Sequence, residues 1–352
     1  MPLEINTLEN AIFRVGPLRE QNGLYQNGTL IESSKLNSNI PVSKSFTPNC
    51  QTQTITRPVF YLGVLYSCWG NCITDNLKHL WPLVHSEQYP ILNDCIFAYS
   101  EVKLFGKSLP ANYYRILQLL GIPESRLLKI EETTRLSKCY LADPCYVQNA
   151  ERREHSFTRE YQNLIDFIIH SCPRTKIETC AKVYFTRTNW DRWEYGEKSI
   201  EKAFRNAGYA IYSPEKMTFD EMISVLQSSE IFASTEGSCA HNSIFLRPKT
   251  ETILLRKFDY VNTYQAAINK ARDLQVQHIN AHFSLIFYDD NDRLGGPFFM
   301  YPSKELRNAI RIRSGHFPLL EFAKYICWST TLHYGHLVGE FIRRHRPSKS
   351  LK

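Results

Sequence analysis

Four short stretches decide the fold of this chain. They read KVYFT at residues 182–186, YAIY at 209–212, EIFAS at 230–234 and TILL at 252–255. Helix-like stretches lie between them: residues 197–207 end before Gly208, and Thr218 with Glu221 has the capping-box spacing that opens a helix. Apolar strands that alternate with helical patterns of this length predict a parallel, doubly wound sheet.

The same alternation is present earlier in the chain. Residues 59–66 (VFYLGVLY) predict a buried strand, and a helix is expected from about Ile73 to Leu83. The stretches that follow predict a strand at 95–99, a helix at 110–121, a strand at 126–130 and a helix at 157–170. We therefore predict an α/β fold of two Rossmann-like domains, joined near residue 173, whose parallel sheets face an interdomain cleft.

The expected domain boundaries follow from this alternation. The first domain comprises residues 1–173. Its lead-in to about Arg57 is rich in Asn, Ser, Thr and Gln and has only short strand-like pieces at 11–15 and 29–31, so we expect an irregular segment or an edge hairpin. The second comprises residues 174–277. Residues 278–352 form a C-terminal extension with a helical end that could pack back on the first domain.

Composition and charge exclude some classes of function. The chain has 352 residues, with 42 Lys and Arg against 35 Asp and Glu, a formal charge of +7. This excess is weaker than that of a dedicated duplex-binding domain, and the cations are interleaved with acids, so we expect no nucleic-acid partner. No stretch is apolar enough to span a membrane and no secretory signal precedes Asn10, so we expect a cytoplasmic protein. The basic tail, Arg343 to Lys352, is interpreted as a solvated end, with peripheral contact to an inner membrane as the alternative.

The cysteines do not suggest a metal site. Ten are spread along the chain without a framework, and they are interpreted as reduced, buried thiols. The closest pairs, Cys68 with Cys72 and Cys139 with Cys145, lack the two-residue spacing and the second pair of a zinc site.

The turn after residue 234 is the strongest candidate for a ligand site. A predicted strand ends at Ser234, small residues let the backbone approach a ligand, and a helix is expected to open at about Ser238 with free N–H groups that suit a pyrophosphate. The candidate donor-binding residues of this turn are Ser234, Glu236, Gly237, Ser238, His241 and Asn242. An ordinary capped strand-to-helix turn is the alternative.

A second candidate follows the strand at 182–186. Arg187 is expected to point into the same cleft, where its guanidinium can grip phosphate oxygens, and Arg192 ends the same stretch. The alternative is a surface loop in which Arg187 pairs with Asp191 or Glu194.

A third candidate follows the strand at 59–66. Asp75 lies in the first turn of the expected helix, where it could stabilise the helix terminus or present a carboxylate to the cleft as a general base.

At these places the chain resembles glycosyltransferase family 61, especially its bacterial members tied to capsular or surface polysaccharide synthesis. The similar stretches are residues 68–83, 182–192, 208–214 and 218–245. The resemblance implies a GT-B architecture with an acceptor-side first domain and a second domain that binds a nucleotide sugar. It makes Asp75 the candidate base, and it assigns the donor to Arg187 and the turn 236–242. Asn71 stands where many relatives have His, and Glu236-Gly237-Ser238 replaces a turn that often has a His between glycines.

The predicted activity is inverting transfer of a sugar from a nucleotide sugar, a UDP-sugar, to a hydroxyl of a surface polysaccharide or glycolipid. No cofactor and no divalent metal are expected. One alternative is a metal-dependent transferase that uses Asp290 and Asp292 after the apolar stretch 283–288. Another is a non-catalytic glycan-binding or assembly protein. A dinucleotide-dependent dehydrogenase or epimerase lacks its Gly-x-Gly-x-x-Gly turn here.

Overall fold

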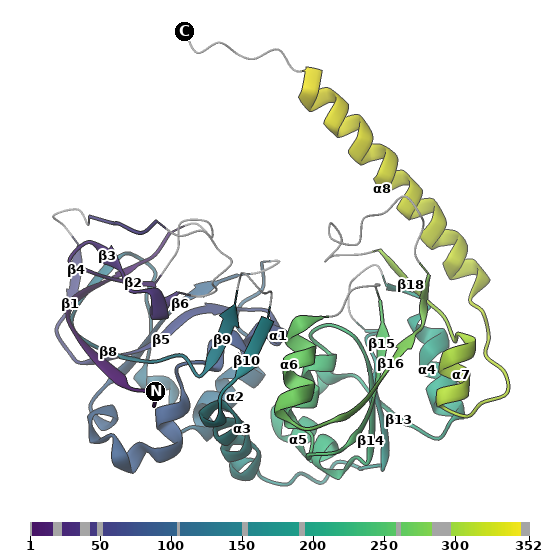
Figure 1. Cartoon of the computed structure of the whole chain (residues 1–352), viewed down its shortest axis with the longest axis horizontal. Helices are drawn as coiled ribbons and strands as arrows, with labels where there is room; N and C mark the ends of the chain where they lie inside the picture. The colour runs from purple at the N-terminus through teal and green to yellow at the C-terminus, as the bar shows by residue number, and fades with distance from the viewer. Residues whose placement is uncertain are drawn as a thin grey trace.

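The computed structural model describes residues 2–16, 23–35, 43–47, 52–103, 106–149, 154–189, 194–257, 262–283 and 297–345. It shows two α/β units side by side, which we call the N-terminal unit (residues up to 171) and the C-terminal unit (residues 182–345) (Figure 1). One apolar core runs through both, because residues such as Phe60 and Tyr113 of the first belong to the same buried cluster as Phe219 and Phe245 of the second.

The N-terminal unit is built on a mixed sheet with strand order β3-β2-β1-β8-β5-β6-β7, and β4 pairs with β8. The bounds are β1 Ile5–Arg14, β2 Gly23–Gln26, β3 Thr29–Leu30, β4 Gln53–Ile55, β5 Val59–Tyr66, β6 Ile96–Val102, β7 Leu127–Lys129 and β8 Thr134–Ala142. Strands β5, β6 and β7 are parallel to one another and β5 is parallel to β8, whereas β1 is antiparallel to both β2 and β8.

One prediction for this unit was wrong, because the sheet is not wholly parallel. The lead-in was expected to be irregular or an edge hairpin with short strand pieces; it forms the antiparallel edge strands β2 and β3 and a ten-residue strand, β1, that pairs with β8 over most of its length. Strand β1 buries Leu8 and the run from Ala11 to Phe13, whereas the residues between them are polar and exposed, so no period-2 pattern marks this strand in the sequence.

The prediction of a helix from Ile73 to Leu83 is also wrong. The chain forms α1 Trp69–Cys72 and then three 3₁₀ turns, η2 Asp75–Leu77, η3 Trp81–Gln88 and η4 Pro90–Asn93. Thr74, with φ −125° and ψ −86°, interrupts the helix, and Pro82 begins a new turn. The apolar residues at helical spacing are nevertheless buried, because Leu77 and Leu80 are inaccessible.

The other helices of this unit match the predictions. Helix α2 spans Ala111–Leu119 after Pro110, and Gly121 beyond its end has φ +80°. Helix α3 spans Arg159–Ser171 and is capped by the Thr158 side chain. A hairpin of β9 Tyr146–Asn149 and β10 Glu154–Phe157 lies between β8 and α3 and contacts α6 of the C-terminal unit.

The C-terminal unit contains the predicted parallel sheet, in the order β13-β11-β14-β15-β16. The bounds are β11 Lys182–Phe185, β13 Ala210–Tyr212, β14 Ile231–Thr235, β15 Glu251–Arg256 and β16 Gln275–Asn280, with α4 Glu197–Asn206, α5 Phe219–Ser228 and α6 Thr263–Ala271. The capping box of Thr218 and Glu221 is formed. Strand β16 runs across residues 277 and 278, so the sheet extends past the boundary predicted from the sequence.

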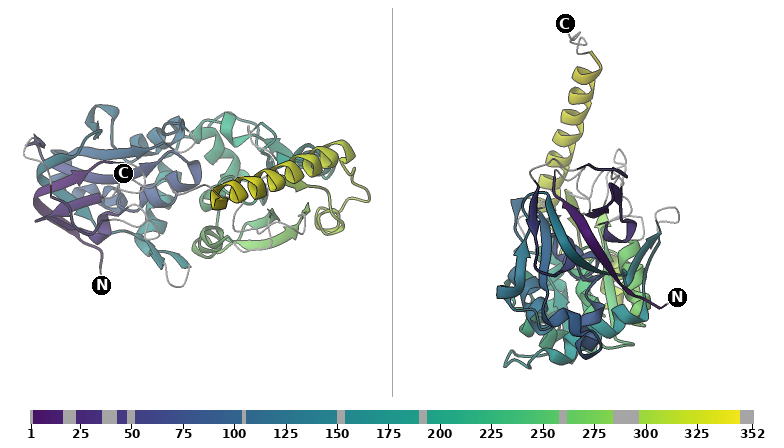
Figure 2. Two further views of the ribbon diagram at one scale, coloured as in Figure 1. Left: turned by 90° about the horizontal axis from the view of Figure 1, so that it is seen from above. Right: turned by 90° about the vertical axis from the view of Figure 1, so that its left-hand side faces the viewer.

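The C-terminal segment joins the C-terminal unit. Strands β12 Glu194–Tyr195, β17 His282–Phe283 and β18 Phe298–Met300 form a small sheet, and α7 Lys304–Ala309 lies against β16. Helix α8 Leu319–His345 starts on β12 and β18 and then projects away from the body (Figures 1 and 2). The contacts of α8 are thus with the C-terminal unit, and not with the N-terminal unit as the sequence allowed. No described helix is long and apolar enough to cross a membrane.

Candidate active site

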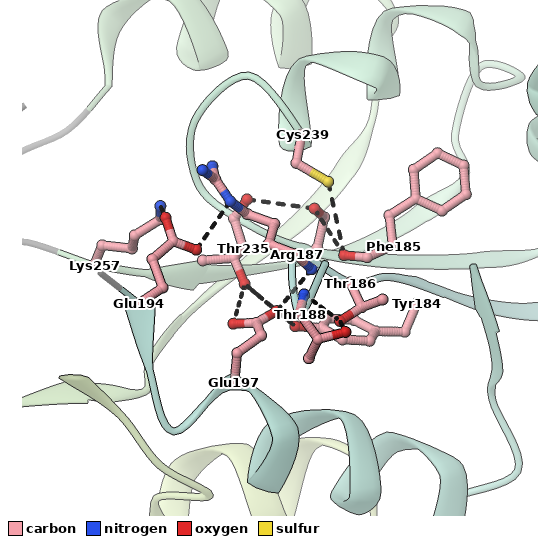
Figure 3. A network of polar contacts seen from close by, with 11 residues as sticks. Tyr184, Phe185, Thr186, Arg187, Thr188, Glu194, Glu197, Thr235, Cys239 and Lys257 are labelled. Carbon is pink, nitrogen blue, oxygen red and sulfur yellow. Dashed lines mark hydrogen bonds and ion pairs between the residues drawn. The ribbon is translucent and has the colours of Figure 1, made fainter. Parts of the chain in front are cut away.

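The end of β11 carries the first part of the candidate site. Arg187 is largely buried, and its Nε lies 2.9 Å from Oε2 of Glu194; Nζ of Lys257 lies 2.6 Å from the other oxygen of the same carboxylate (Figure 3). Two cations thus share one carboxylate. The pairing of Arg187 with Glu194 was the alternative raised from the sequence, but the pair is enclosed and not part of a surface loop.

A second carboxyl group, that of Glu197, lies beneath this cluster. Glu197 begins α4 and is buried, and it accepts hydrogen bonds from the Tyr184 hydroxyl, the Thr235 hydroxyl and the Arg187 backbone N–H. Burial, with a smaller contribution from Glu194, raises the pKa of Glu197, and burial lowers the pKa of Lys257. The shifts of both groups thus follow from their enclosure at this strand end.

The turn after β14 meets this cluster. Gly237 has φ +114°, and a Cβ atom there would lie 3.2 Å from Nη1 of Arg187, so a glycine lets the guanidinium approach the backbone. Glu236 is buried: its Oε1 lies 3.1 Å from Nδ1 of His278, and its Oε2 is buried with no hydrogen-bond partner among the described residues. An unpaired carboxylate oxygen at this edge is suited to accept a ligand hydroxyl.

Ser234, the predicted donor-binding residue that lies in β14, is not available to a ligand. Its side chain is inaccessible, and its hydroxyl donates to backbone carbonyls.

The helix expected to open at about Ser238 is a short 3₁₀ helix, η8 Ala240–Phe245. Side chains of this helix and of the turn before it contact the N-terminal unit. The Ser238 hydroxyl lies 3.5 Å from the Cys68 thiol, and Asn242 accepts a 2.7 Å hydrogen bond from the Trp69 indole. Ser238 and Asn242 therefore connect the turn to α1.

His241 is held in the same junction. It is buried, and Nδ1 lies 2.9 Å from Oε1 of Gln265, whose amide nitrogen donates to Ser243 and Asn269. Gln265 Oε1 is thus the acceptor and His241 Nδ1 carries the proton. Burial lowers the pKa of His241 to about 4, so the ring is neutral at pH 7.

Asp75, the predicted base, lies across the junction in the N-terminal unit, but it does not face an open cleft. It is 2% exposed. Asn71 and Thr74 donate to Oδ2 at 2.8 and 2.9 Å, and Gln148 donates to Oδ1 at 2.9 Å. Burial raises the pKa of Asp75, while the hydrogen bonds from Asn71 and Thr74 and the charge of nearby Lys78 oppose the rise. Burial also lowers the pKa of Lys78 to about 8.

Sequence reasoning missed several of these residues. Lys257 completes the Arg187 cluster, His278 holds Glu236, and Gln148 covers Asp75. Lys257 had a usable signal, since it follows the predicted strand at 252–255 as Arg187 follows its own strand. Gln148 had none, because it is 73 residues from Asp75.

Three residues predicted from the sequence cannot be placed, and the described residues hold no metal site. Arg192, Asp290 and Asp292 are outside the described residues, and no group of three His, Cys, Asp or Glu side chains in the described ranges could hold a metal ion. The nine described cysteines are all free thiols. A cavity of about 640 Å³ lies between α2, residues 175–177 and the start of α5, and none of the predicted site residues lines it.

A family model described as Glycosyltransferase 61 matches residues 69–253, more than half of the chain. The match runs from α1 into β15 and includes Asp75 and all the predicted donor-binding residues, whereas Lys257 and His278 lie beyond it. No curated protein matches the chain.

Proposed function

The chain belongs to glycosyltransferase family 61, and on that premise we propose that it moves a sugar from a UDP-sugar to a hydroxyl of a surface polysaccharide or glycolipid, with inversion at the anomeric carbon and no divalent metal. The observation that carries the donor assignment is the pair of buried cations, Arg187 and Lys257, beside the Gly237 turn. Two cations that share one carboxylate can balance a diphosphate in an enclosed site.

The two α/β units support a GT-B arrangement in which the donor binds to the C-terminal unit. Arg187 and Lys257 face the phosphates, and the unpaired oxygen of Glu236 accepts a hydroxyl of the ribose or the sugar. The acceptor approaches from the N-terminal unit. A lipid-linked acceptor on the cytoplasmic face of a membrane would allow the basic tail, Arg343 to Lys352, to contact anionic headgroups.

Asp75 is the base in this proposal. It takes the proton of the acceptor hydroxyl while that oxygen forms a bond to the anomeric carbon, and the bond from this carbon to the phosphate oxygen breaks. The nucleotide diphosphate leaves with the electron pair, and its charge is balanced by Arg187 and Lys257. A single displacement of this kind inverts the configuration. The raised pKa of Asp75 makes it a stronger base than an exposed aspartate.

The base is tested by Asp75→Asn. We expect turnover to fall by about 10²-fold or more, with UDP binding unchanged, because only the proton acceptor is removed. The matched control is Asp94→Asn at an exposed aspartate, which should retain activity. Near-normal turnover of a folded Asp75→Asn protein would remove Asp75 from the mechanism.

The donor site is tested by Arg187→Gln. We expect UDP affinity, measured by calorimetry in EDTA, to fall about tenfold or more, since one charge-assisted contact is lost. Arg205→Gln, at an exposed arginine of α4, is the control. Binding that requires manganese would contradict the metal-free mechanism and direct attention to Asp290 and Asp292. Binding of UDP-sugars without any transfer or hydrolysis would instead favour a non-catalytic glycan-binding protein.

A further inference from the structure

The carboxylate of Asp75 is closed off, although a base must contact the acceptor hydroxyl. Both oxygens already accept hydrogen bonds, from Asn71, Thr74 and Gln148. Asn71 and Thr74 belong to the same local stretch as Asp75, whereas Gln148 comes from β9. Because Gln148 is half-buried and lies on a separate element, it is the donor that can leave without rebuilding α1 and η2.

The amide nitrogen of Gln148 has two hydrogens but three acceptor oxygens within hydrogen-bond distance. This nitrogen lies 2.9 Å from Asp75 Oδ1, 3.0 Å from the Tyr264 hydroxyl and 3.3 Å from the Tyr146 hydroxyl. If the contact with Asp75 is released, both hydrogens still have acceptors. The Gln148 side chain can thus move away from the carboxylate of Asp75 by a small rearrangement in which both amide hydrogens remain hydrogen-bonded.

The alternative acceptors are fixed by the contact between the two units. Tyr264 is on α6, and its ring stacks on His155 of β10 at 3.9 Å between centroids. The Tyr146 hydroxyl lies 2.6 Å from Nδ1 of the same histidine. The two hydroxyls are therefore positioned by the docking of the β9–β10 hairpin on α6.

We propose that Gln148 is a gate over Asp75: it covers the carboxylate until an acceptor hydroxyl replaces its amide, and Tyr264 and Tyr146 then hold it aside. Gln148 is a positioning residue in this proposal, which rests on Asp75 as the base. The gate keeps water from the base while a donor is bound without an acceptor, and thereby limits hydrolysis of the nucleotide sugar.

The first test needs no activity. Carboxyl groups are labelled with a carbodiimide and glycine ethyl ester, and the labelled peptides are quantified by mass spectrometry. Asp75 should resist labelling in the wild-type protein, react several-fold faster in Gln148→Ala, and be unchanged in Gln277→Ala, a control at an exposed glutamine of the C-terminal sheet. Asp166, 47% exposed, is the internal standard, and the buried Glu197 reports that the fold is intact. Equal resistance of Asp75 in Gln148→Ala overturns the gate.

The second test separates the gate from the base. With UDP-N-acetylglucosamine and UDP-glucose as donors and no acceptor, Gln148→Ala should release UDP several-fold faster than wild type, and Gln148→Ala combined with Asp75→Asn should lose that gain. No gain in the single variant overturns the gate and leaves the base standing. A gain that persists without Asp75 overturns the base and the gate that rests on it.

Tyr264→Phe provides a readout that a merely structural role would not give. The variant retains the contact of Gln148 with Asp75, so labelling of Asp75 should remain low, but the opened amide loses its best acceptor and kcat should fall several-fold. Tyr301→Phe, in the C-terminal segment, is the matched control. Unchanged kcat in Tyr264→Phe contradicts the proposed open position of the gate.

Discussion

At the scale of single residues, burial shifts the ionisable side chains of the candidate site. It lowers the pKa of His241 to about 4, so that this ring is neutral at pH 7, and it raises the pKa of Glu197. The guanidinium of Arg187 and the ammonium group of Lys257 both form ion pairs with the carboxylate of Glu194. The basic side chains of the candidate donor site are therefore Arg187 and Lys257, whereas His241 contributes hydrogen bonds.

The neutral His241 predicts how stability depends on pH. Its pKa is about 6.5 when unfolded and about 4 when folded, so the unfolded chain binds more protons between these values. The stability that His241 contributes is present above pH 6.5 and is lost as the pH falls to about 4, by up to ~3 kcal/mol. His241→Gln should flatten the fall of the melting temperature over this window. An unchanged slope would contradict a buried, neutral His241.

Lys78 predicts the pH profile of the reaction. It is buried beside Asp75, and its charge lowers the pKa of that carboxyl group. Lys78→Met should raise the pKa of Asp75 further and move the acid limb of kcat/KM to higher pH, since the proposed mechanism requires ionised Asp75. Lys202→Met, at an exposed lysine of α4, should leave the limb in place. If the acid limb of the kcat/KM profile does not move in Lys78→Met, a group other than Asp75 is responsible for that limb.

At the scale of elements, the entry into α4 is fixed by its surroundings. Gly196 lies between β12 and α4 with φ +87°. A Cβ atom there would lie 1.8 Å from the backbone oxygen of Met300 in β18. The close approach brings β18 onto the start of α4, and it places Glu194 and Glu197 on either side of one glycine. The geometry of the Arg187 cluster thus depends on a backbone contact with the C-terminal segment.

Gly196→Ala tests this contact. Two costs add in the variant: a left-handed conformation for a residue with a side chain, about 1 kcal/mol, and overpacking against β18, about 1–3 kcal/mol. Gly208→Ala is the matched control, since Gly208 has φ +81° but a Cβ there meets nothing within 4 Å. We expect Gly208→Ala to show only the first cost in chemical denaturation. Equal losses in the two variants would contradict the close approach of β18.

At the scale of the whole molecule, the two units are joined by apolar packing and a few directed contacts. The shared buried cluster is continuous across the junction. Arg115 of α2 contacts both carboxylate oxygens of Asp220 in α5 at 2.9 Å, and the Trp69 indole donates to the buried Asn242. Because α1 also carries Asn71, these contacts link the surroundings of Asp75 to the turn after β14.

Trp69→Phe should separate stability from activity. Loss of the indole N–H leaves the buried Oδ1 of Asn242 unpaired, which costs about 1–3 kcal/mol, and loosens the link between α1 and the turn. Trp81→Phe is the control, because its indole donates to the backbone of Asp143 within the N-terminal unit. We expect both variants to lower the free energy of unfolding, but only Trp69→Phe to lower kcat/KM several-fold. Equal kcat/KM values would show that the link is not used.

The sequence by itself determined the parallel sheet of the C-terminal unit, its capping box at Thr218 and the family. These follow from short-range patterns, because a buried strand between helices is apolar along its whole length and a cap lies within one helical turn. Only the tertiary structure decided that β1 pairs with β8, that α8 leaves the body, and that Arg187 and Lys257 share Glu194. It also placed Gln148 over Asp75 and next to Tyr264, 116 residues further along the chain. Such contacts depend on how separate elements pack, and nothing in the local sequence around Gln148 specifies its partners.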